Sequence, residues 1–332
     1  MSTLEIPFLL FKKGICEDRH AGSPIFFDEQ QFQQEHELMD HNRLKGRPPF
    51  PFETIAVAVA FSPRLEAILS EARQLARTFQ ANLLLIHVGK RTPGKEAILA
   101  ELCGDVGIGS EAKVLWQRGD PVSGLLRTCK ENIVDLLVLG ALRQESMFRY
   151  YLGSVARGLS RSAKCSLLLL TEPRTDGSTF STVMVDCVDH PKTLPTIDTA
   201  LYFGRSMSTR EMCLVREVDP AGLAMVMSDD STDRERETVK EQLLLEAEET
   251  IRQKTGDADV GSMQIVNSVL WGRPGFAIRK FAEEKSANLL VINSPDSRYG
   301  LFDRIFTHDL EYILEHLPCN ILIVHSRLPG QI

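Results

Sequence analysis

Two stretches of this chain repeat one pattern: a strand-like apolar run, a loop, a short helix-like segment and a second apolar run. The first stretch covers residues 135–170 and the second covers residues 288–324. In the first stretch Gly140 ends the apolar run, and Gly153 and Ser154 precede the helix-like segment. Glycine lets backbone N–H groups approach a phosphate closely, and a helix N-terminus presents free N–H donors with a positive dipole end. The first stretch therefore predicts a phosphate-binding loop.

The second stretch lacks the residues that this chemistry needs. Asn293 and Phe306 stand where the first stretch has its two glycines, and Asp296 lies between them. Side chains at these positions obstruct close approach of a ligand to the backbone, and a carboxylate repels phosphate. We therefore expect a duplicated fold in which phosphate chemistry is confined to the first half.

The composition is that of an ordinary globular protein with two domains. The chain has 332 residues, of which 43% are hydrophobic and 25% charged, and its net charge is −7. An acidic balance argues against a nucleic-acid partner, because phosphate backbones are bound by clustered Lys and Arg. No apolar run reaches the roughly 20 residues that cross a bilayer, so no membrane insertion is expected. The seven cysteines form no CxxC pair, which is typical of reduced thiols in a cytoplasmic protein.

The elements that position the loop are strands alternating with helices. A helical pattern of apolar residues runs from Leu65 to Phe79, between the first two strand-like runs. Short apolar strands joined by helices predict an α/β fold with a parallel sheet covered on both faces. The expected strands are Thr54–Ala60, Leu83–Val88, Lys113–Trp116, Val134–Leu139 and Ser166–Leu170.

The same pattern restarts after a polar linker. Pro63 matches Pro191 at an offset of 128 residues, whereas Pro121 matches Pro274 at an offset of 153. The difference of 25 residues requires an insertion, which we assign to an acidic helical stretch near residues 229–256. The expected division is an arm over residues 1–51 with one helix over 28–44, domain 1 over 52–172, a linker over 173–180 and domain 2 over 181–327.

From about Phe52 to Ser326 the chain resembles the universal stress protein (UspA-like) family in its tandem two-domain form. In that family a loop of the form G-x2-G-x9-G-[ST] follows the fourth strand, and a Gly-Asp-Pro-like turn precedes that strand. The segment Gly119-Asp120-Pro121 matches the turn, and the glycines and serine of the first stretch match the outer loop positions. The resemblance implies two doubly wound, Rossmann-like (HUP-type) domains of five parallel strands in the order 3-2-1-4-5. It also implies a pseudo-dimer joined through the last strands, Ser166–Leu170 and Asn320–Val324.

The resemblance implies ATP as the ligand of domain 1, with Mg²⁺ accompanying ATP as the only expected metal. In nucleotide-binding members an Asp ends the first strand, and this chain has Ala60 there; Arg143 replaces the middle glycine. A guanidinium at that position can pair with phosphate or occupy the pocket as a resident cation. In domain 2 Val188 takes the first-strand position, or Asp189 does if the register is shifted by one. The implied site residues are Ala60, Val88, Leu139, Gly140, Arg143, Gly153, Ser154 and Val155.

Three functions stay open on the sequence. The first is a non-enzymatic cytoplasmic stress-response protein that binds ATP in domain 1. The second is a nucleotide-independent scaffold for partner proteins, in which both sites are degenerate. The third is a weak ATPase, although no GxSxG, HExxH or GxxxxGK[ST] motif and no general base support it. Pairing of the two domains within the chain is expected, and a homodimer is a further candidate assembly.

Several other residues invite chemistry and have a simpler interpretation. Cys16, His20, His36 and His41 are clustered, but their spacing fits no zinc-site template, so we predict no metal site. For His87, at the end of the second strand, we expect a buried and hydrogen-bonded imidazole, because no nucleophile with a fitting context accompanies it. Gly140 and Gly153 also have a packing interpretation, because glycine permits tight turns and close contacts next to strands and helices.

Overall fold

The computed structural model describes residues 48–110, 112–144, 149–151, 153–173, 180–219, 233–255, 259–295 and 312–326. The chain divides into two compact units, residues 1–45 and 46–332, and all described residues belong to the second unit. The predicted helix over residues 28–44 and the Cys/His cluster at Cys16, His20, His36 and His41 lie outside the described residues.

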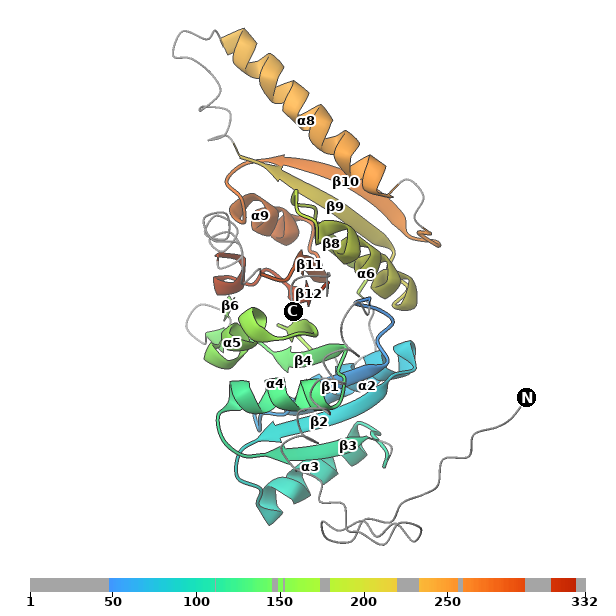
Figure 1. The fold of residues 1–332 in the computed structure, drawn as a ribbon, viewed down its shortest axis with the longest axis vertical. Helices are drawn as coiled ribbons and strands as arrows, with labels where there is room; N and C mark the ends of the chain where they lie inside the picture. The colour runs from blue at the N-terminus through green and yellow to red at the C-terminus, as the bar shows by residue number, and fades with distance from the viewer. Residues whose placement is uncertain are drawn as a thin grey trace, which may run out of the picture. The chain divides into compact units, whose positions relative to one another are not determined.

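Domain 1 contains the expected alternation of strands and helices (Figure 1). Its strands are β1 (Thr54–Ala58), β2 (Asn82–Val88), β3 (Lys113–Gln117), β4 (Leu136–Gly140), β5 (Leu142–Gln144), β6 (Arg149–Tyr151) and β7 (Ser166–Leu170). Its helices are α2 (Leu65–Phe79), α3 (Pro93–Asp105), α4 (Pro121–Glu131) and α5 (Ser154–Ser162). The short strands β5 and β6 pair with each other as a hairpin between β4 and α5, a feature that the apolar pattern did not predict.

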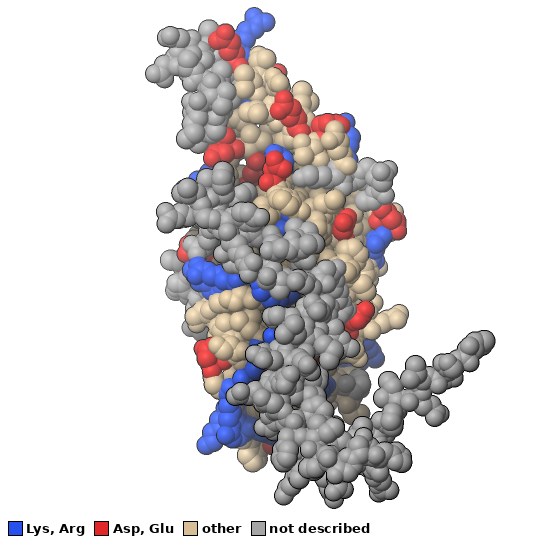
Figure 2. Space-filling view, viewed as in Figure 1, with Lys and Arg blue, Asp and Glu red and all other residues tan. Residues whose placement is uncertain are grey.

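The described elements of domain 2 follow the same order, with the long helix α8 at the place that α3 has in domain 1. Its strands are β8 (Thr182–Asp186), β9 (Glu211–Val218), β10 (Gln264–Trp271), β11 (Leu289–Asn293) and β12 (Asn320–Val324). Its helices are α6 (Thr193–Ser206), α8 (Asp233–Thr255) and α9 (Phe276–Glu284). Helix α8 lies in the expected insertion, packs on β9 and β10, and carries repeated acidic side chains (Figures 1 and 2).

The two domains form one continuous sheet of ten strands. Its order is β10-β9-β8-β11-β12-β7-β4-β1-β2-β3, so each domain has the predicted order 3-2-1-4-5. Within this ten-stranded sheet, all strand pairs inside one domain are parallel. Between the domains, β7 and β12 pair antiparallel, with Leu168 opposite Leu322. The predicted pseudo-dimer through the last strands is therefore confirmed. Every residue of β7 and β12 is buried, as their runs of Leu and Ile require for strands covered on both faces.

The helices form because their apolar residues recur at helical spacing. In α2 the buried side chains lie on one stripe from Leu65 to Phe79, and the helix ends at Gln80, whose φ of 54° is left-handed. Helix α4 begins with Pro121 after Asp120, whose carboxylate accepts a 2.8 Å hydrogen bond from the Ser123 N–H. This hydrogen bond lowers the pKa of the Asp120 carboxyl, and it explains the Gly-Asp-Pro turn as a helix cap.

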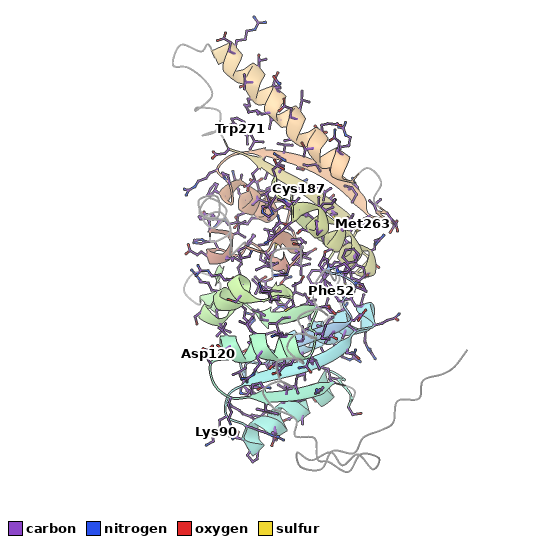
Figure 3. All side chains as sticks on the ribbon, in the orientation of Figure 1. Phe52, Lys90, Asp120, Cys187, Met263 and Trp271 are labelled. Carbon is purple, nitrogen blue, oxygen red and sulfur yellow. The ribbon has the colours of Figure 1, made fainter. Side chains whose placement is uncertain are left out.

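An aromatic cluster joins the two domains next to the strand junction. Phe52 lies at the start of domain 1 (Figure 3). Its ring is edge-on to the rings of Phe79 and Tyr202, with ring centres 5.1 and 5.6 Å away. Phe203 of α6 continues the cluster to Phe180, at 5.2 Å. Rings in this arrangement bury large areas and prefer such edge-on geometry, so they help hold α6 of domain 2 against domain 1.

Asn320 ties the two domains by hydrogen bonds at the junction. Its Oδ1 accepts from the Thr171 N–H at 2.9 Å and from the Thr171 hydroxyl at 3.2 Å. Its Nδ2 donates to the Asn288 carbonyl at 2.9 Å. Because Asn320 is only 4% exposed, water cannot replace these partners.

We predict that Asn320→Ala lowers the free energy of unfolding by about 2–4 kcal/mol, because it leaves a buried N–H and a buried carbonyl unpaired. Urea denaturation followed by circular dichroism measures this change. The control is Asn82→Ala, which removes an exposed amide at 3.4 Å from the Glu53 carbonyl and should change the free energy by less than about 0.5 kcal/mol. Equal stability of the two variants would contradict a structural role for Asn320.

Candidate functional site

A pocket of about 560 Å³ opens at the carboxyl ends of β1, β2 and β4 in domain 1. Strand β1 pairs with β2 on one side and β4 on the other, so the pocket lies at the point where the strand order reverses. Ligands of open α/β sheets bind at this point. Seven of the eight predicted site residues line the pocket: Ala60, Val88, Leu139, Gly140, Gly153, Ser154 and Val155. The eighth, Arg143, belongs to β5, and its side chain lies outside what the structure describes.

The walls of the pocket divide into an apolar part and a polar part. The apolar part consists of aliphatic side chains from the strand ends and from α4, among them Ile86, Val88, Leu125 and Leu139. The polar part is the N-terminus of α5. Its N-cap residue is Gly153, so no N-cap side chain accepts a hydrogen bond from the first N–H groups of the helix. The first N–H groups of an α-helix have no partner within the helix, so they and the helix dipole favour an anion there.

Two cations belong to the pocket lining, and each has a defined partner. Arg64, the N-cap residue of α2, donates from Nη1 to the Ala141 carbonyl at 2.7 Å and from Nη2 to the Leu170 carbonyl at 3.2 Å. Its Nη2 also donates to the Thr171 carbonyl. The guanidinium thus joins the ends of β4 and β7, and it brings a permanent positive charge to the pocket. Sequence analysis missed this role, because nothing in the local pattern distinguishes Arg64 from a surface arginine.

His87 is buried and bonded on both ring nitrogens. Its Nδ1 lies 2.9 Å from the Val59 carbonyl, and its Nε2 lies 3.2 Å from Lys95 Nζ. A carbonyl can only accept, so Nδ1 carries the proton and Nε2 accepts from the ammonium. The ring also contacts Phe61 and Trp116 edge-on, at 4.9 and 5.1 Å. The expectation of a hydrogen-bonded structural imidazole is confirmed.

Both glycines of the predicted loop are in close contact with side chains. A Cβ on Gly140 would lie 2.7 Å from Ile68 Cδ1, and a Cβ on Gly153 would lie 2.7 Å from Leu142 Cδ1. Neither position has a left-handed φ, so the need for glycine comes from space and not from backbone strain. The packing interpretation therefore holds at both positions, and it is compatible with an additional role in ligand binding.

In domain 2 a buried lysine takes the position of Arg64. Lys192 lies 128 residues after Arg64 and is likewise the N-cap residue of its helix, α6. It is 2% exposed, and its Nζ donates to the Ser294 carbonyl at 2.8 Å and to the Pro295 carbonyl at 3.3 Å. Ala141 and Ser294 are related by the offset of 153 residues, so the two cations bind equivalent carbonyls.

Polar side chains at the end of β11 and the start of α6 are hydrogen-bonded to one another. Asn293, at the position of Gly140, accepts from the Thr196 hydroxyl at 2.5 Å and donates to the Thr193 hydroxyl at 3.1 Å. Thr193 in turn donates to the Val188 carbonyl at 2.6 Å. Where domain 1 pairs Ile68 with a glycine, domain 2 pairs a threonine with an asparagine.

The alignment of the first strands decides the register of domain 2. Val188 occupies the position of Ala60, since β1 and β8 align at the offset of 128 residues. Asp189 then corresponds to Phe61, and its side chain is exposed. Asp296, Phe306 and Thr307, which the sequence placed in the second loop, lie outside the described residues.

None of the described cysteines lines the pocket. The six described cysteines are free, and burial raises the pKa of Cys319 to about 12 and that of Cys213 to about 11, so these two thiols stay protonated. Cys187 is buried inside domain 2 (Figure 3). In the part of the chain that the structure describes, no group of three His, Cys, Asp or Glu side chains could hold a metal ion. Within the same residues no helix combines the length and apolar character of a membrane span.

Comparison with solved structures shows the same fold over most of the chain. A functionally unknown protein from Pseudomonas aeruginosa PAO1 aligns with a TM-score of 0.62 at 17% identity, covering 85% of this chain and 94% of that one. A putative universal stress protein from P. aeruginosa UCBPP-PA14 gives a TM-score of 0.60 at 17% identity, covering 82% and 93%. A universal stress protein from Archaeoglobus fulgidus DSM 4304 gives 0.58 at 15% identity, covering 83% and 100%.

Comparison with curated protein sequences finds no match. The model of the universal stress protein family matches residues 90–171 and 211–325, one segment in each domain. These segments make up more than half of the 332 residues, so the chain belongs to the universal stress protein family.

Proposed function

We propose that this protein acts in the cytoplasmic stress response by binding ATP in domain 1, without catalysing a reaction. The observation that carries this proposal is the asymmetry of the two crevices. Domain 1 has a pocket of about 560 Å³ at the carboxyl ends of its strands, whereas in domain 2 the hydrogen-bonded Lys192 and Asn293 stand at the positions of Arg64 and Gly140. The pocket has the size and the largely apolar lining of a typical small-molecule site.

The chemistry of the walls supports an anionic ligand with a flat apolar part. The N-terminus of α5 favours phosphate oxygens, and Arg64 and Lys95 add positive charge. No Asp or Glu occurs among the described residues that line the pocket. The aliphatic side chains from the strand ends and from α4 suit a nucleobase. Mg²⁺ would be held by the phosphates and water.

The pocket lining supports binding more than catalysis. Both nitrogens of His87 are engaged, and the described lining contains no carboxylate that could act as a general base. Ala60 offers no carboxylate that could bind a ribose hydroxyl. We therefore expect the phosphates to supply most of the binding free energy. These observations favour a binding protein over a weak ATPase.

One observation favours the alternative of a nucleotide-independent scaffold. A methyl group of Leu142 lies against Gly153, where a phosphate would approach the α5 N-terminus. Leu142 is 49% exposed, so its side chain has room to turn away. Binding measurements separate the two functions.

We predict that the purified protein binds one ATP per chain, and that Ser154→Asp weakens binding at least tenfold. A carboxylate at the start of α5 would repel the phosphates, with about 4 kcal/mol between unit charges 4 Å apart near a protein surface. Isothermal titration calorimetry measures both quantities. Ser286→Asp adds the same charge at an exposed position after α9 and should leave the affinity unchanged.

Gly153→Phe tests the same site by steric exclusion, because it introduces the residue that domain 2 has at its corresponding loop position. We expect loss of ATP binding with little change in the unfolding temperature of domain 2. Mass spectrometry of molecules released from the denatured wild-type protein gives an independent readout. No heat on titration together with no co-purified nucleotide would overturn the ATP proposal in favour of the scaffold.

A further prediction concerns the buried lysine of domain 2. Lys192→Met removes a buried donor from the Ser294 and Pro295 carbonyls, and we expect it to lower the free energy of unfolding by about 2–4 kcal/mol. ATP affinity and the stoichiometry of one should stay the same, because the proposed ATP site lies in domain 1. Lys285→Met, at an exposed position, is the control for loss of charge. A second ATP site appearing in wild-type protein would contradict the assignment.

A further inference from the structure

One segment of domain 2, residues 312–320, contacts the parts of domain 1 that frame the polar end of the pocket. We call residues 312–320 the docking segment. The Leu317 N–H donates to the Tyr150 carbonyl at 3.2 Å, which forms an antiparallel bridge between the docking segment and strand β6. Leu317 is buried, so this hydrogen bond is shielded from water.

Two further contacts lie on either side of this bridge. Arg157 of α5 lies opposite Glu315, with 3.8 Å between Nη1 and Oε1. Asn320 accepts from the backbone and the hydroxyl of Thr171, directly after β7. The docking segment thus reaches the β5–β6 hairpin, helix α5 and the end of β7.

Residues of the β5–β6 hairpin also contact residues of domain 1 that line the pocket. Leu142, in β5, lines the pocket and lies against Gly153. Tyr150, in β6, has its ring 5.4 Å from the Arg64 guanidinium and its hydroxyl 3.2 Å from Glu172 Oε1. A shift of Tyr150 would therefore displace the residues next to both the cation and the helix N-terminus.

Such a short hairpin depends on outside contacts for its position. Each of its strands has three residues, and the two strands pair with each other outside the ten-stranded sheet. An isolated two-stranded hairpin is marginally stable at best in water. The docking segment supplies the bridge that fixes β6 from outside the domain.

We propose that domain 2 is a positioning partner for the ligand site of domain 1. The docking segment holds the hairpin and α5 in the geometry that leaves the pocket open. Binding of an anionic ligand and docking of this segment then stabilise each other, because linkage between two sites is reciprocal. The ligand half of this inference rests on the proposed function, whereas the positioning half concerns the protein alone.

The positioning half is tested on the full chain without nucleotide. Leu317→Pro removes the N–H that reaches Tyr150, and Leu317→Ala removes the same buried side chain while keeping the N–H. We expect amide hydrogen exchange over residues 149–157 to be roughly fivefold faster in Leu317→Pro than in Leu317→Ala, as loss of about one hydrogen bond implies. Equal exchange in the two variants would overturn the inference whether or not ATP binds.

The ligand half is tested by titrating ATP into Glu315→Gln. This experiment does not depend on whether Leu317→Pro folds. Positioning through Arg157 predicts binding about two- to fivefold weaker than wild type, the range of an exposed ion pair. A direct charge effect predicts the reverse, because removing a carboxylate near α5 would strengthen binding of an anion.

Glu131→Gln is the control, because it breaks an exposed ion pair with Arg127 that lies within α4. We expect ATP affinity in this variant to equal that of wild type. Unchanged or tighter binding by Glu315→Gln would overturn the reciprocal coupling. Absence of ATP binding in wild-type protein would instead overturn the proposed function and leave the exchange experiment to decide the positioning role.

Discussion

The antiparallel pairing of β7 with β12 is the interaction on which the rest of the structure depends. It joins two five-stranded parallel sheets into one sheet of ten strands. Both strands are buried throughout, so neither could be exposed to water without a large loss of apolar burial. Because the strands are paired, two hydrophobic layers run across the junction on the two faces of the sheet. The docking segment leads directly into β12, so its place beside the pocket of domain 1 follows from this pairing.

The two domains share one fold but differ in the side chains at equivalent positions of their ligand crevices. At the helix N-cap position Arg64 joins the ends of two strands, whereas Lys192 inserts a compact ammonium between carbonyls. At the end of the fourth strand, Gly140 leaves room for Ile68 and for a pocket. Asn293 instead fills that space and is hydrogen-bonded on both sides by threonines. The described parts of the two crevices therefore differ by exchanges of a few side chains at equivalent positions.

The sequence predicted the five main strands of each domain, the two-domain duplication and the strands that join the domains. Alternation of apolar runs with helical periodicity is a local signal, and it is strong where strands are buried on both faces. It missed the β5–β6 hairpin, because three-residue strands carry too few residues for a periodic pattern. It placed seven site residues on one pocket, some at strand ends and the others at the N-terminus of α5. It did not reveal Arg64, Lys192 or the docking segment, whose partners lie between 77 and 167 residues away.

By itself the sequence determined which segments are strands and helices, and that the second loop had lost its glycines, since both depend on residue type and local spacing. Only the tertiary structure decided what the glycines of the first loop contact and which carbonyls Arg64 and Lys192 bind. It also decided that a segment of domain 2 lies beside the pocket of domain 1. These features depend on the space between side chains that are distant in the sequence, and no local pattern encodes that space. Gly140 illustrates the difference: its type was evident from the sequence, whereas its contact with Ile68 came from folding.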